Sequence, residues 1–328
     1  MFNLAGKSIL LTGGTGSFGT EFVKTILQDG KVEQIIVYSR DELKQFEMAE
    51  RFQSSKLKFI LGDIRDNERL KTACADVQVI IHAAAMKQIP ASESNPIEAI
   101  KTNVLGAQNV VSAAIDNGVE RVIALSTDKA ANPANLYGAT KLCSDKLMMA
   151  GNSLRESSST KFSVVRYGNV LGSRGSVIPF FLHKAKEGVI PITDENMTRF
   201  WLTLQDGVQF VLSSLERMYG GEIFVPKIPS FKVVDVAEVV CPGIPIRIIG
   251  IRPGEKLHEV MITEDDSLNT FEFDQFYAIV APGSTNVSHY KKSAKKVSQG
   301  FKFSSDNNTW WHTHDSFKKL LIAQGIIN

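Results

Sequence analysis

The first twenty residues contain an apolar run that leads directly into a glycine-rich turn. Ser8–Leu11 is followed by Thr-Gly-Gly-Thr-Gly-Ser-Phe-Gly at 12–19, with glycines at positions 13, 16 and 19. Gly13 permits a tight turn, Gly16 lets backbone N–H groups approach a pyrophosphate, and Gly19 lets the next helix pack against the strand. Unpaired N–H groups at the start of that helix favour an anion. This pattern predicts a strand–turn–helix unit that binds a nucleotide, although such turns also form for conformational reasons alone.

Bulk properties exclude several functional classes. The chain has 328 residues, of which 43% are hydrophobic, enough for one large or two modest domains. Its net charge of +2 does not suggest binding to nucleic acid or a membrane surface, and we find neither a long apolar span nor a signal peptide. Cys74, Cys143 and Cys241 show no metal-ligand spacing or disulfide framework, so we expect no metal and a cytoplasmic location.

Strands and helices alternate through the first half of the chain. The predicted strands are Ser8–Thr12, Gln34–Tyr38, Lys58–Leu61, Val77–His82, Arg121–Ser126 and Phe162–Tyr167. The predicted helices between them are Phe18–Gln28, Asp41–Phe52, Glu68–Cys74, Pro96–Asn117 and Leu136–Ala150. This alternation predicts an α/β fold with a Rossmann-type, doubly wound parallel sheet, which binds its ligand at the carboxyl ends of the strands.

Regular alternation is lost in the second half, where glycine and proline become frequent. We expect residues 1–167 to form the dinucleotide-binding domain and residues 168–328 to be mainly a smaller substrate-binding region. Glu222–Val225 is a candidate for a strand that returns to the main sheet. Pro282–Gln299 is polar and lacks a period, which predicts a loop, and the apolar face of Phe317–Ile326 predicts a final helix.

Side chains after the second strand bear on the choice of cofactor. NAD sites usually have a carboxylate here that accepts from the ribose 2′-hydroxyl. Ser39 and Arg40 instead offer a hydroxyl and a guanidinium, which suit the 2′-phosphate of NADP. Asp41 is close enough to act as that carboxylate, so NAD remains an alternative cofactor. Asp41 could equally be the N-cap of the next helix. We therefore favour NADP.

Two further strand ends offer contacts for the rest of a dinucleotide. Asp63 follows the third strand, where it either accepts from the adenine amine or caps a helix, and Ile64 is placed to pack on the adenine ring. Ala83 and Ala84 follow the fourth strand, and their small side chains let a nicotinamide ribose lie against the backbone. His82 is expected to be a buried, hydrogen-bonded histidine.

The strongest chemical feature is the fifth strand end, Leu125-Ser-Thr-Asp-Lys129, followed by Tyr137 and Lys141. Tyr137 and Lys141 are four residues apart and share one helix face. A lysine ammonium lowers the pKa of a nearby phenol, which can then take a proton from a sugar hydroxyl as hydride leaves. Asp128 and Lys129 could form a plain surface ion pair, but their place after the Ser-Thr strand end favours a catalytic role.

These motifs together resemble the extended short-chain dehydrogenase/reductase superfamily, through nearly the whole chain. Thr127-Asp-Lys129 narrows the resemblance to the inverting UDP-N-acetylglucosamine 4,6-dehydratases, which begin pseudaminic acid synthesis in bacteria, because retaining nucleotide-sugar dehydratases have Thr-Asp-Glu there. Further stretches agree: Tyr38–Gln45, Ala130–Pro133, Leu136–Leu142, Arg166–Asn169, Gly172–Ser176, Met197–Phe200, Gly221–Lys227 and Arg252–Lys256.

The resemblance implies a role for each catalytic group. Tyr137 would deprotonate the 4-hydroxyl while hydride passes from carbon 4 to NADP⁺. A neutral Lys129 would remove the carbon-5 proton, and a protonated Asp128 would donate to the leaving 6-hydroxyl before hydride returns to carbon 6. The donor to the opposite face of carbon 5 is not identified. A neutral Lys129 requires a depressed pKa, from burial or from a cation such as Lys141 or Lys87.

The expected site residues form three sets. The catalytic set is Thr127, Asp128, Lys129, Tyr137 and Lys141. The cofactor set is Gly13, Thr15, Gly16, Ser17, Phe18, Gly19, Ser39, Arg40, Asp41, Lys44, Asp63, Ile64, Ala83, Ala84, Lys87, Tyr137 and Lys141. The set for the UDP-sugar, whose diphosphate suits guanidinium groups, is Lys87, Asn169, Arg174, Arg199, Arg252 and Glu255. The resemblance also implies a homo-oligomer built on a dimer, with hexamers among the inverting dehydratases.

Three alternatives remain open. A UDP-sugar 4-epimerase shares the cofactor, the tyrosine and the lysine, but it eliminates no water and needs neither Asp128 nor Lys129. A capsule-type UDP-N-acetylglucosamine dehydratase is closer, but that subgroup tends to replace the tyrosine, and Tyr137 is intact. A non-catalytic dinucleotide-binding regulator would have lost catalytic groups, and none is lost.

Overall fold

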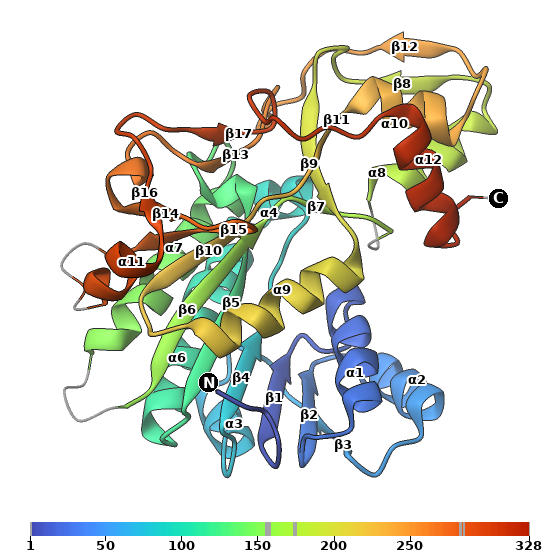
Figure 1. Ribbon diagram of the computed structural model, residues 1–328. Helices are drawn as coiled ribbons and strands as arrows, with labels where there is room; N and C mark the ends of the chain where they lie inside the picture. The colour runs from blue at the N-terminus through green and yellow to red at the C-terminus, as the bar shows by residue number, and fades with distance from the viewer. Residues whose placement is uncertain (1, 155–158, 173–175, 282–283, 285, 328) are drawn as a thin grey trace.

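A ten-stranded sheet forms the centre of the molecule in the computed structural model, which describes residues 2–154, 159–172, 176–281, 284 and 286–327 (Figure 1). The strand order is β16-β14-β15-β10-β6-β5-β4-β1-β2-β3. Seven strands are parallel: β3 (Leu57–Leu61), β2 (Gln34–Ser39), β1 (Ser8–Thr12), β4 (Val79–His82), β5 (Arg121–Thr127), β6 (Lys161–Tyr167) and β10 (Glu222–Pro226). The predicted Rossmann-type α/β fold is confirmed.

The sheet is extended past β10 by three antiparallel strands from the end of the chain. They are β15 (Phe276–Val280), β14 (Thr270–Glu272) and β16 (Lys295–Lys296). The second half therefore contributes four strands to the main sheet, where the sequence offered one candidate. The separate substrate-binding region from residue 168 stays a prediction.

The strand register brings polar groups together at the carboxyl edge of the sheet. Thr12 of β1 lies opposite Tyr38 of β2 and His82 of β4, and His82 lies opposite Ala124 of β5. β5 continues beyond that pair to Thr127. Successive strands are added on one side of β1 up to β3 and on its other side from β4 onward. Doubly wound sheets open a crevice for a ligand at such a point, here between β1 and β4.

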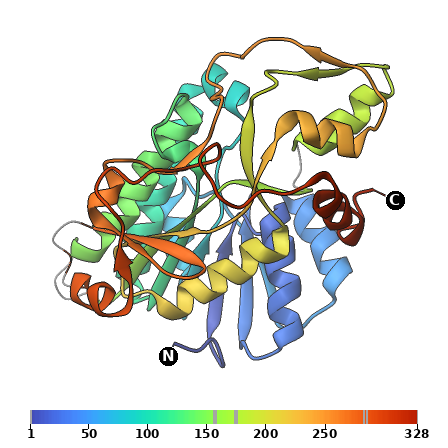
Figure 2. The same cartoon turned by 45° about the horizontal axis from the view of Figure 1, so that its top comes forward.

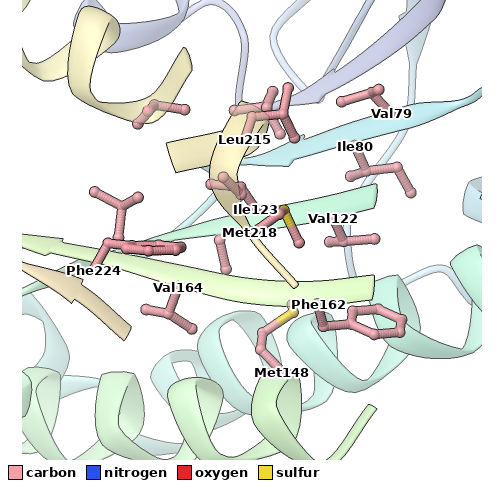
Figure 3. Close-up of a cluster of buried hydrophobic side chains, with 14 of the residues drawn as sticks. Val79, Ile80, Val122, Ile123, Met148, Phe162, Val164, Leu215, Met218 and Phe224 are labelled. Atoms are coloured by element: carbon pink, nitrogen blue, oxygen red, sulfur yellow. The ribbon is translucent and has the colours of Figure 1, made fainter. Parts of the chain in front are cut away.

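Helices cover both faces of the sheet. α1 (Ser17–Asp29) packs beside α9 (Leu204–Arg217) on one face, and α6 (Gly106–Asp116) lies beside α7 (Leu136–Ala150) and α3 (Asn67–Ala73) on the other. Figure 3 shows Leu215 of α9 and Met148 of α7 on opposite sides of strands that carry Ile123 and Phe162. All four side chains are fully buried, so burial of apolar area from both faces stabilises the sheet.

A smaller lobe of short elements lies beside the sheet (Figures 1 and 2). α8 (Val177–Ala185), α10 (Val233–Val240) and α12 (His314–Ala323) surround a second apolar cluster that includes Phe181, Phe231 and Phe317. Its strands are β7 (Asn169–Val170), β9 (Thr198–Leu202) and β11 (Ser230–Lys232) in one sheet, and β8 (Ile190–Ile192) with β12 (Ile246–Ile248). A further pair, β13 (Val260–Ile262) with β17 (Phe303–Ser304), packs instead against the main core through Met261, Ile262 and Phe303.

Three predicted elements differ from the structure in kind or by more than two residues at an end, whereas the other predicted strands and helices agree within two residues. The helix over Pro96–Asn117 is divided into α5 (Pro96–Ile100), a π-helical turn over Lys101–Leu105, and α6. Within Pro282–Gln299, the described residues form α11 (Val287–Ser293) and β16 instead of a loop. The final helix is α12, which begins three residues before Phe317 because Thr313 and Ser316 form a capping box.

The remaining short elements connect this frame. They are α2 (Glu42–Phe52), α4 (Ile89–Ser94) and the 3₁₀ turns Asp128–Ala130, Gly151–Ser153 and Asp266–Asn269. Among the residues that the structure describes, no helix combines the length and apolar character that a membrane span needs.

Candidate active site

A cavity of about 960 Å³ lies at the carboxyl edge of the sheet and extends to the lobe. Its walls bring together most of the predicted site residues: Gly13, Thr15, Gly16, Ser17, Phe18, Gly19, Ser39, Arg40, Asp41, Lys44, Ile64, Ala83, Ala84, Lys87, Thr127, Lys129, Tyr137, Lys141, Asn169, Arg199, Arg252 and Glu255. Asp63 and Asp128 do not line it, and Arg174 lies outside the described residues.

The glycine turn between β1 and α1 has different requirements at each glycine. Gly13 has φ +66°, and a Cβ there would lie 2.8 Å from the backbone of Ala84. A Cβ at Gly19 would lie 2.1 Å from the carbonyl oxygen of Gly14. A Cβ at Gly16 would meet only the Gly13 oxygen, at 3.3 Å. Folding therefore requires glycine at positions 13 and 19, whereas the openness at Gly16 fits the approach of a ligand.

The first turn of α1 is suited to a phosphate. Its N-cap, Gly16, provides no side-chain hydrogen bond, and the turn has no acidic residue. The N–H groups of such a turn, with the helix dipole, attract an anion.

The end of β2 presents hydroxyl and cationic groups. Ser39 Oγ accepts from Thr15 Oγ1 at 3.3 Å and from Gln45 Nε2 at 3.2 Å. The Arg40 side chain is 61% exposed and therefore accessible to a ligand. Asp41 is the N-cap of α2, where it accepts from the Lys44 N–H at 3.0 Å and pairs with the Lys44 ammonium. The structural role foreseen for Asp41 is thus present.

Asp63 and Ile64 follow β3. Asp63 binds the Arg65 guanidinium at 2.6 Å, and although burial raises its pKa, hydrogen bonds from Arg65 hold the pKa below its ordinary value. Ile64 is 5% exposed and lines the cavity. Asp66, three residues after Asp63, is the N-cap of α3. The capping alternative for Asp63 is therefore wrong.

Behind the turn, His82 is buried and bonded to β1. Its Nδ1 lies 2.8 Å from Thr12 Oγ1, and Thr12 Oγ1 also accepts from Ala84 N at 3.3 Å. Burial, reinforced by the charge of Lys141, lowers the pKa of His82 to about 3. His82 is thus a neutral structural histidine that fixes the backbone over which Ala83 and Ala84 line the cavity.

The π-helical turn places a side chain that sequence reasoning missed. Asn103 accepts from Met86 N at 2.8 Å and donates to Met86 O at 2.9 Å and to Thr140 Oγ1 at 3.0 Å. Met86 precedes Lys87, whose ammonium has a pKa lowered by burial. Asn103 therefore connects the segment that carries Lys87 to α7. π-Turns are frequent at functional sites, but apolar periodicity does not reveal one.

Tyr137 lies at the start of α7, and Lys141 and Asp145 follow at intervals of one turn. Burial raises the pKa of Tyr137 to about 12, while the Lys129 ammonium and a hydrogen bond with Thr127 act in the opposite direction. The cation that acts to lower this pKa in the structure is Lys129, and the predicted effect of Lys141 on the Tyr137 pKa stays a prediction. Burial lowers the pKa of Lys141, and the Asp145 carboxylate opposes that shift.

Asp128 and Lys129 occupy the 3₁₀ turn at the end of β5. Lys129 Nζ lies 3.0 Å from Asp128 Oδ1 and 3.2 Å from Oε1 of Glu259, a residue absent from the predicted sets. Burial raises the pKa of Asp128. Burial lowers the pKa of Lys129, but the charges of Asp128 and Glu259 outweigh burial and raise the pKa above its ordinary value. The predicted depressed pKa of Lys129 is wrong for this structure; among its neighbours, Arg199 is the cation that lowers it.

The lobe contributes the remaining polar walls. Arg199 donates to backbone oxygens of Thr198, Leu257 and Lys256 at 2.6, 3.0 and 3.0 Å, so its guanidinium fixes the chain around it. Its substrate contact stays a prediction. Arg252 and Glu255, which both line the cavity, form an ion pair. Asn169 Oδ1 is buried and accepts no hydrogen bond from the described residues, which leaves it available to a ligand.

Known proteins resemble this chain over most of its length. Residues 9–281 match the family described as "Polysaccharide biosynthesis protein". A Campylobacter jejuni protein named UDP-N-acetylglucosamine 4,6-dehydratase (inverting) is 55% identical over 95% of each chain. A Rickettsia typhi protein named UDP-glucose 4-epimerase is 40% identical over 97% of this chain and 96% of its own. The X-ray structure of Pen from Bacillus thuringiensis matches with a TM-score of 0.92 and 36% identity, over 99% of this chain and 100% of the other.

Proposed function

We propose that this chain, which belongs to the polysaccharide biosynthesis protein family, is an inverting UDP-N-acetylglucosamine 4,6-dehydratase. One observation carries the proposal. Tyr137 and Lys129 line the same cavity as the glycine turn, and Lys129 is paired there with Asp128. The tyrosine and the turn suit oxidation by a nicotinamide, and the acid–lysine pair suits loss of water. The similarity to the C. jejuni protein of that name supports the same activity.

The residues present fit a nicotinamide dinucleotide. Gly16 and the uncapped first turn of α1 would hold its pyrophosphate, and Ala83, Ala84, Tyr137 and Lys141 would lie along its nicotinamide ribose. When bound, the group accepts hydride from carbon 4 and returns it to carbon 6. We propose NADP over NAD, because Ser39 and Arg40 suit a 2′-phosphate while Asp41 is engaged with Lys44.

Tyr137 acts first in the proposed mechanism. It takes the proton of the sugar 4-hydroxyl as hydride leaves carbon 4. Its pKa of about 12 disfavours the phenolate at neutral pH, so the ammonium groups of Lys129 and Lys141 are needed to stabilise it. The resulting 4-keto group acidifies the proton on carbon 5.

Asp128 and Lys129 then remove water. One proton transferred from Lys129 Nζ to Asp128 Oδ1 along their 3.0 Å contact gives an amine and a carboxylic acid at once. Burial favours this uncharged form of Asp128. The amine takes the carbon-5 proton. Asp128 does not line the cavity, so its proton reaches the departing 6-hydroxyl through the hydroxyl of Thr127, which lines the cavity and lies 2.9 Å from Asp128 Oδ1. The ammonium–carboxylate pair is then restored.

A single incubation tests this assignment. The purified chain is mixed with NADP⁺ and UDP-N-acetylglucosamine in deuterated water. We expect a 4-keto-6-deoxy product with deuterium on carbon 5 and inverted configuration there. Lys129→Met should abolish carbon-5 exchange, whereas exposed Lys318→Met should not. Deuterium-labelled product with retained configuration would contradict the inverting assignment.

A second candidate function is UDP-sugar 4-epimerisation, which the 40% identity to the R. typhi protein favours. It uses Tyr137 and the dinucleotide but gives no role to the ion pair between buried Asp128 and half-buried Lys129. The same incubation separates the two, because an epimerase would yield UDP-N-acetylgalactosamine without deuterium on carbon 5. No turnover at all would favour a non-catalytic dinucleotide-binding regulator.

The finer biological setting is also part of this proposal. We place the reaction in the cytoplasm, at the first step of pseudaminic acid synthesis, on the basis of the sequence resemblance; flagellin, a capsule and lipopolysaccharide are the candidate acceptors of the sugar. We further propose a dimer-based homo-oligomer, hexameric by that resemblance. The resemblance places the dimer contact on the segments Pro96–Asn117 and Leu136–Ala150, which include α6 and α7. Light scattering of the purified chain tests the assembly.

A further inference from the structure

A buried carboxylate that the proposed mechanism does not use lies on the cavity wall. Glu259 directly precedes β13 and is 2% exposed. Its Oε1 lies 3.2 Å from Lys129 Nζ and 3.7 Å from Arg199 Nε, and its Oε2 lies 3.9 Å from Lys256 Nζ. Oε2 accepts no hydrogen bond from the described residues. Burying a carboxylate is unfavourable unless cations compensate it, and here three do.

The backbone of Glu259 is fixed by a segment far along the chain. Its N–H donates to Ser305 Oγ at 2.9 Å, and the Ser305 N–H donates to the Glu259 carbonyl oxygen at 2.8 Å. The Ser305 and Thr198 hydroxyls are hydrogen-bonded at 2.7 Å. Thr198 belongs to β9, the strand that also carries Arg199. These contacts hold Glu259 on both sides of its α-carbon, so the position of its backbone is well defined.

Lys129 lies between two carboxylates of different character. Asp128 Oδ1 and Glu259 Oε1 are 3.0 and 3.2 Å from Nζ. Burial raises the pKa of Asp128. Burial also acts to raise the pKa of Glu259, but Lys129, Arg199 and Lys256 together hold that pKa below its ordinary value. Asp128 is therefore the better proton acceptor, and Glu259 keeps its negative charge.

We propose that Glu259 is a positioning residue that holds the Lys129 side chain at the cavity wall, within hydrogen-bond reach of Asp128, for the elimination step. This inference rests on the proposed function and deepens it. Glu259 neither gains nor loses a proton: the proton moves between Lys129 and Asp128, and Glu259 keeps an acceptor beside Nζ in both states. Arg199 and Lys256 compensate its charge, so the carboxylate remains ionised inside the protein.

The proposal has a consequence for the pH dependence. A carboxylate beside an ammonium raises the pKa of the ammonium, so loss of the Glu259 charge makes neutral Lys129 available at lower pH. The acid limb of kcat in Glu259→Gln should therefore move to lower pH, by about one unit or more at this separation. The charged or titratable groups that act on this cluster are Asp128 and Lys129 from the 3₁₀ turn, Tyr137 from α7, Arg199 from β9, and Lys256.

The test compares kcat and KM across pH for the wild type, E259Q, E259D and E264Q, with carbon-5 deuterium incorporation as the readout. Glu264 is an exposed glutamate five residues along, so E264Q should behave as the wild type. In E259Q we expect kcat to fall about 10- to 100-fold, with little change in KM, because a displaced base loses its alignment. E259D retains the charge at a greater distance from Nζ and should lie between the wild type and E259Q.

Each outcome bears on the inference. An acid limb shifted to lower pH in E259Q, with an intermediate E259D, supports it. A reduced kcat with an unshifted limb would mean that Glu259 only supports the fold, and would overturn it. If E259Q does not fold, E259D decides, and an E259D indistinguishable from the wild type refutes the proposal. Absence of any wild-type product would instead reject the proposed dehydratase itself.

Discussion

Substitution of the first two glycines of the fingerprint should separate folding from ligand binding. Gly13→Ala must accommodate both a φ of +66° and a Cβ 2.8 Å from the Ala84 backbone. Left-handed strain and overpacking together cost about 2–5 kcal/mol of unfolding free energy. For a chain of 328 residues the unfolding entropy is roughly 0.7 kcal/mol per degree. We therefore expect Tm to fall by about 3–7 °C in Gly13→Ala.

Gly16→Ala should change stability little but weaken cofactor binding. Gly16 has φ −75° and ψ 174°, which alanine adopts freely, and its Cβ meets only one oxygen. The cost of alanine at a helix N-cap is about 1 kcal/mol or less, so Tm should change by about 1 °C. The methyl group would, however, occupy the approach of a pyrophosphate. We expect the Kd for NADP⁺ to rise at least about 10-fold, which is about 1.4 kcal/mol.

Two measurements on each variant are enough: Tm by differential scanning fluorimetry and the NADP⁺ Kd by calorimetry. Gly118→Ala is a matched control, because Gly118 has φ +64° and nothing within 4 Å of the added Cβ. Its loss of stability reports the backbone strain alone, and the excess in Gly13→Ala reports the contact with Ala84. An unchanged Kd in a stable Gly16→Ala would refute the location of the pyrophosphate at this turn.

Three further predictions concern other parts of the site. Asp128→Asn should still oxidise carbon 4, seen as absorbance of reduced cofactor, but should form product at least about 100-fold more slowly; unimpaired product formation would remove Asp128 from the elimination step. Arg40→Ala should raise the Kd for NADP⁺ about 10-fold and leave that for NAD⁺ unchanged, and equal changes for both would count against a 2′-phosphate contact. His82 is neutral in the folded chain because its pKa is lowered to about 3, whereas the unfolded chain takes up its proton near pH 6.5. Stability should therefore fall on acidification from pH 6.5 to 5, by up to about 2 kcal/mol. The loss of stability between pH 6.5 and 5 should be smaller in His82→Asn. An equal loss in both proteins would contradict the neutral state of His82.

The first half of the fold could be predicted from the sequence because its information is local. The predicted strand Ser8–Thr12 and helix Leu136–Ala150 have the bounds found in the structure. Each is a regular apolar pattern bounded by a turn or a cap, such as Asn135, which accepts from Gly138 N at 2.8 Å. The parallel order then brings together the strand ends, and the polar residues that follow them, without further assumptions.

The differences arise where a distant contact decides the local structure. The π-turn in the predicted helix Pro96–Asn117 accompanies the contacts of Asn103 with Met86 and Thr140, and nothing in the helix sequence indicates them. α11 is short and weakly periodic, but the Tyr290 hydroxyl donates to buried Glu222 of β10 at 3.0 Å. Glu259 follows the same rule. Its neighbours Leu257 and His258 do not predict that the fold brings its carboxylate into contact with Lys129.

The hydrogen bonds between Ser305 and the backbone of Glu259 make the position of one active-site carboxylate depend on a late part of the chain. The glycine turn and Tyr137 lie within the first 137 residues, so ribosomes synthesise them well before residue 305. The carboxylate beside Lys129 gains its backbone anchor only after residue 305 has left the ribosomal tunnel. A chain that ends before residue 305 therefore lacks the hydrogen bonds that fix the backbone of Glu259.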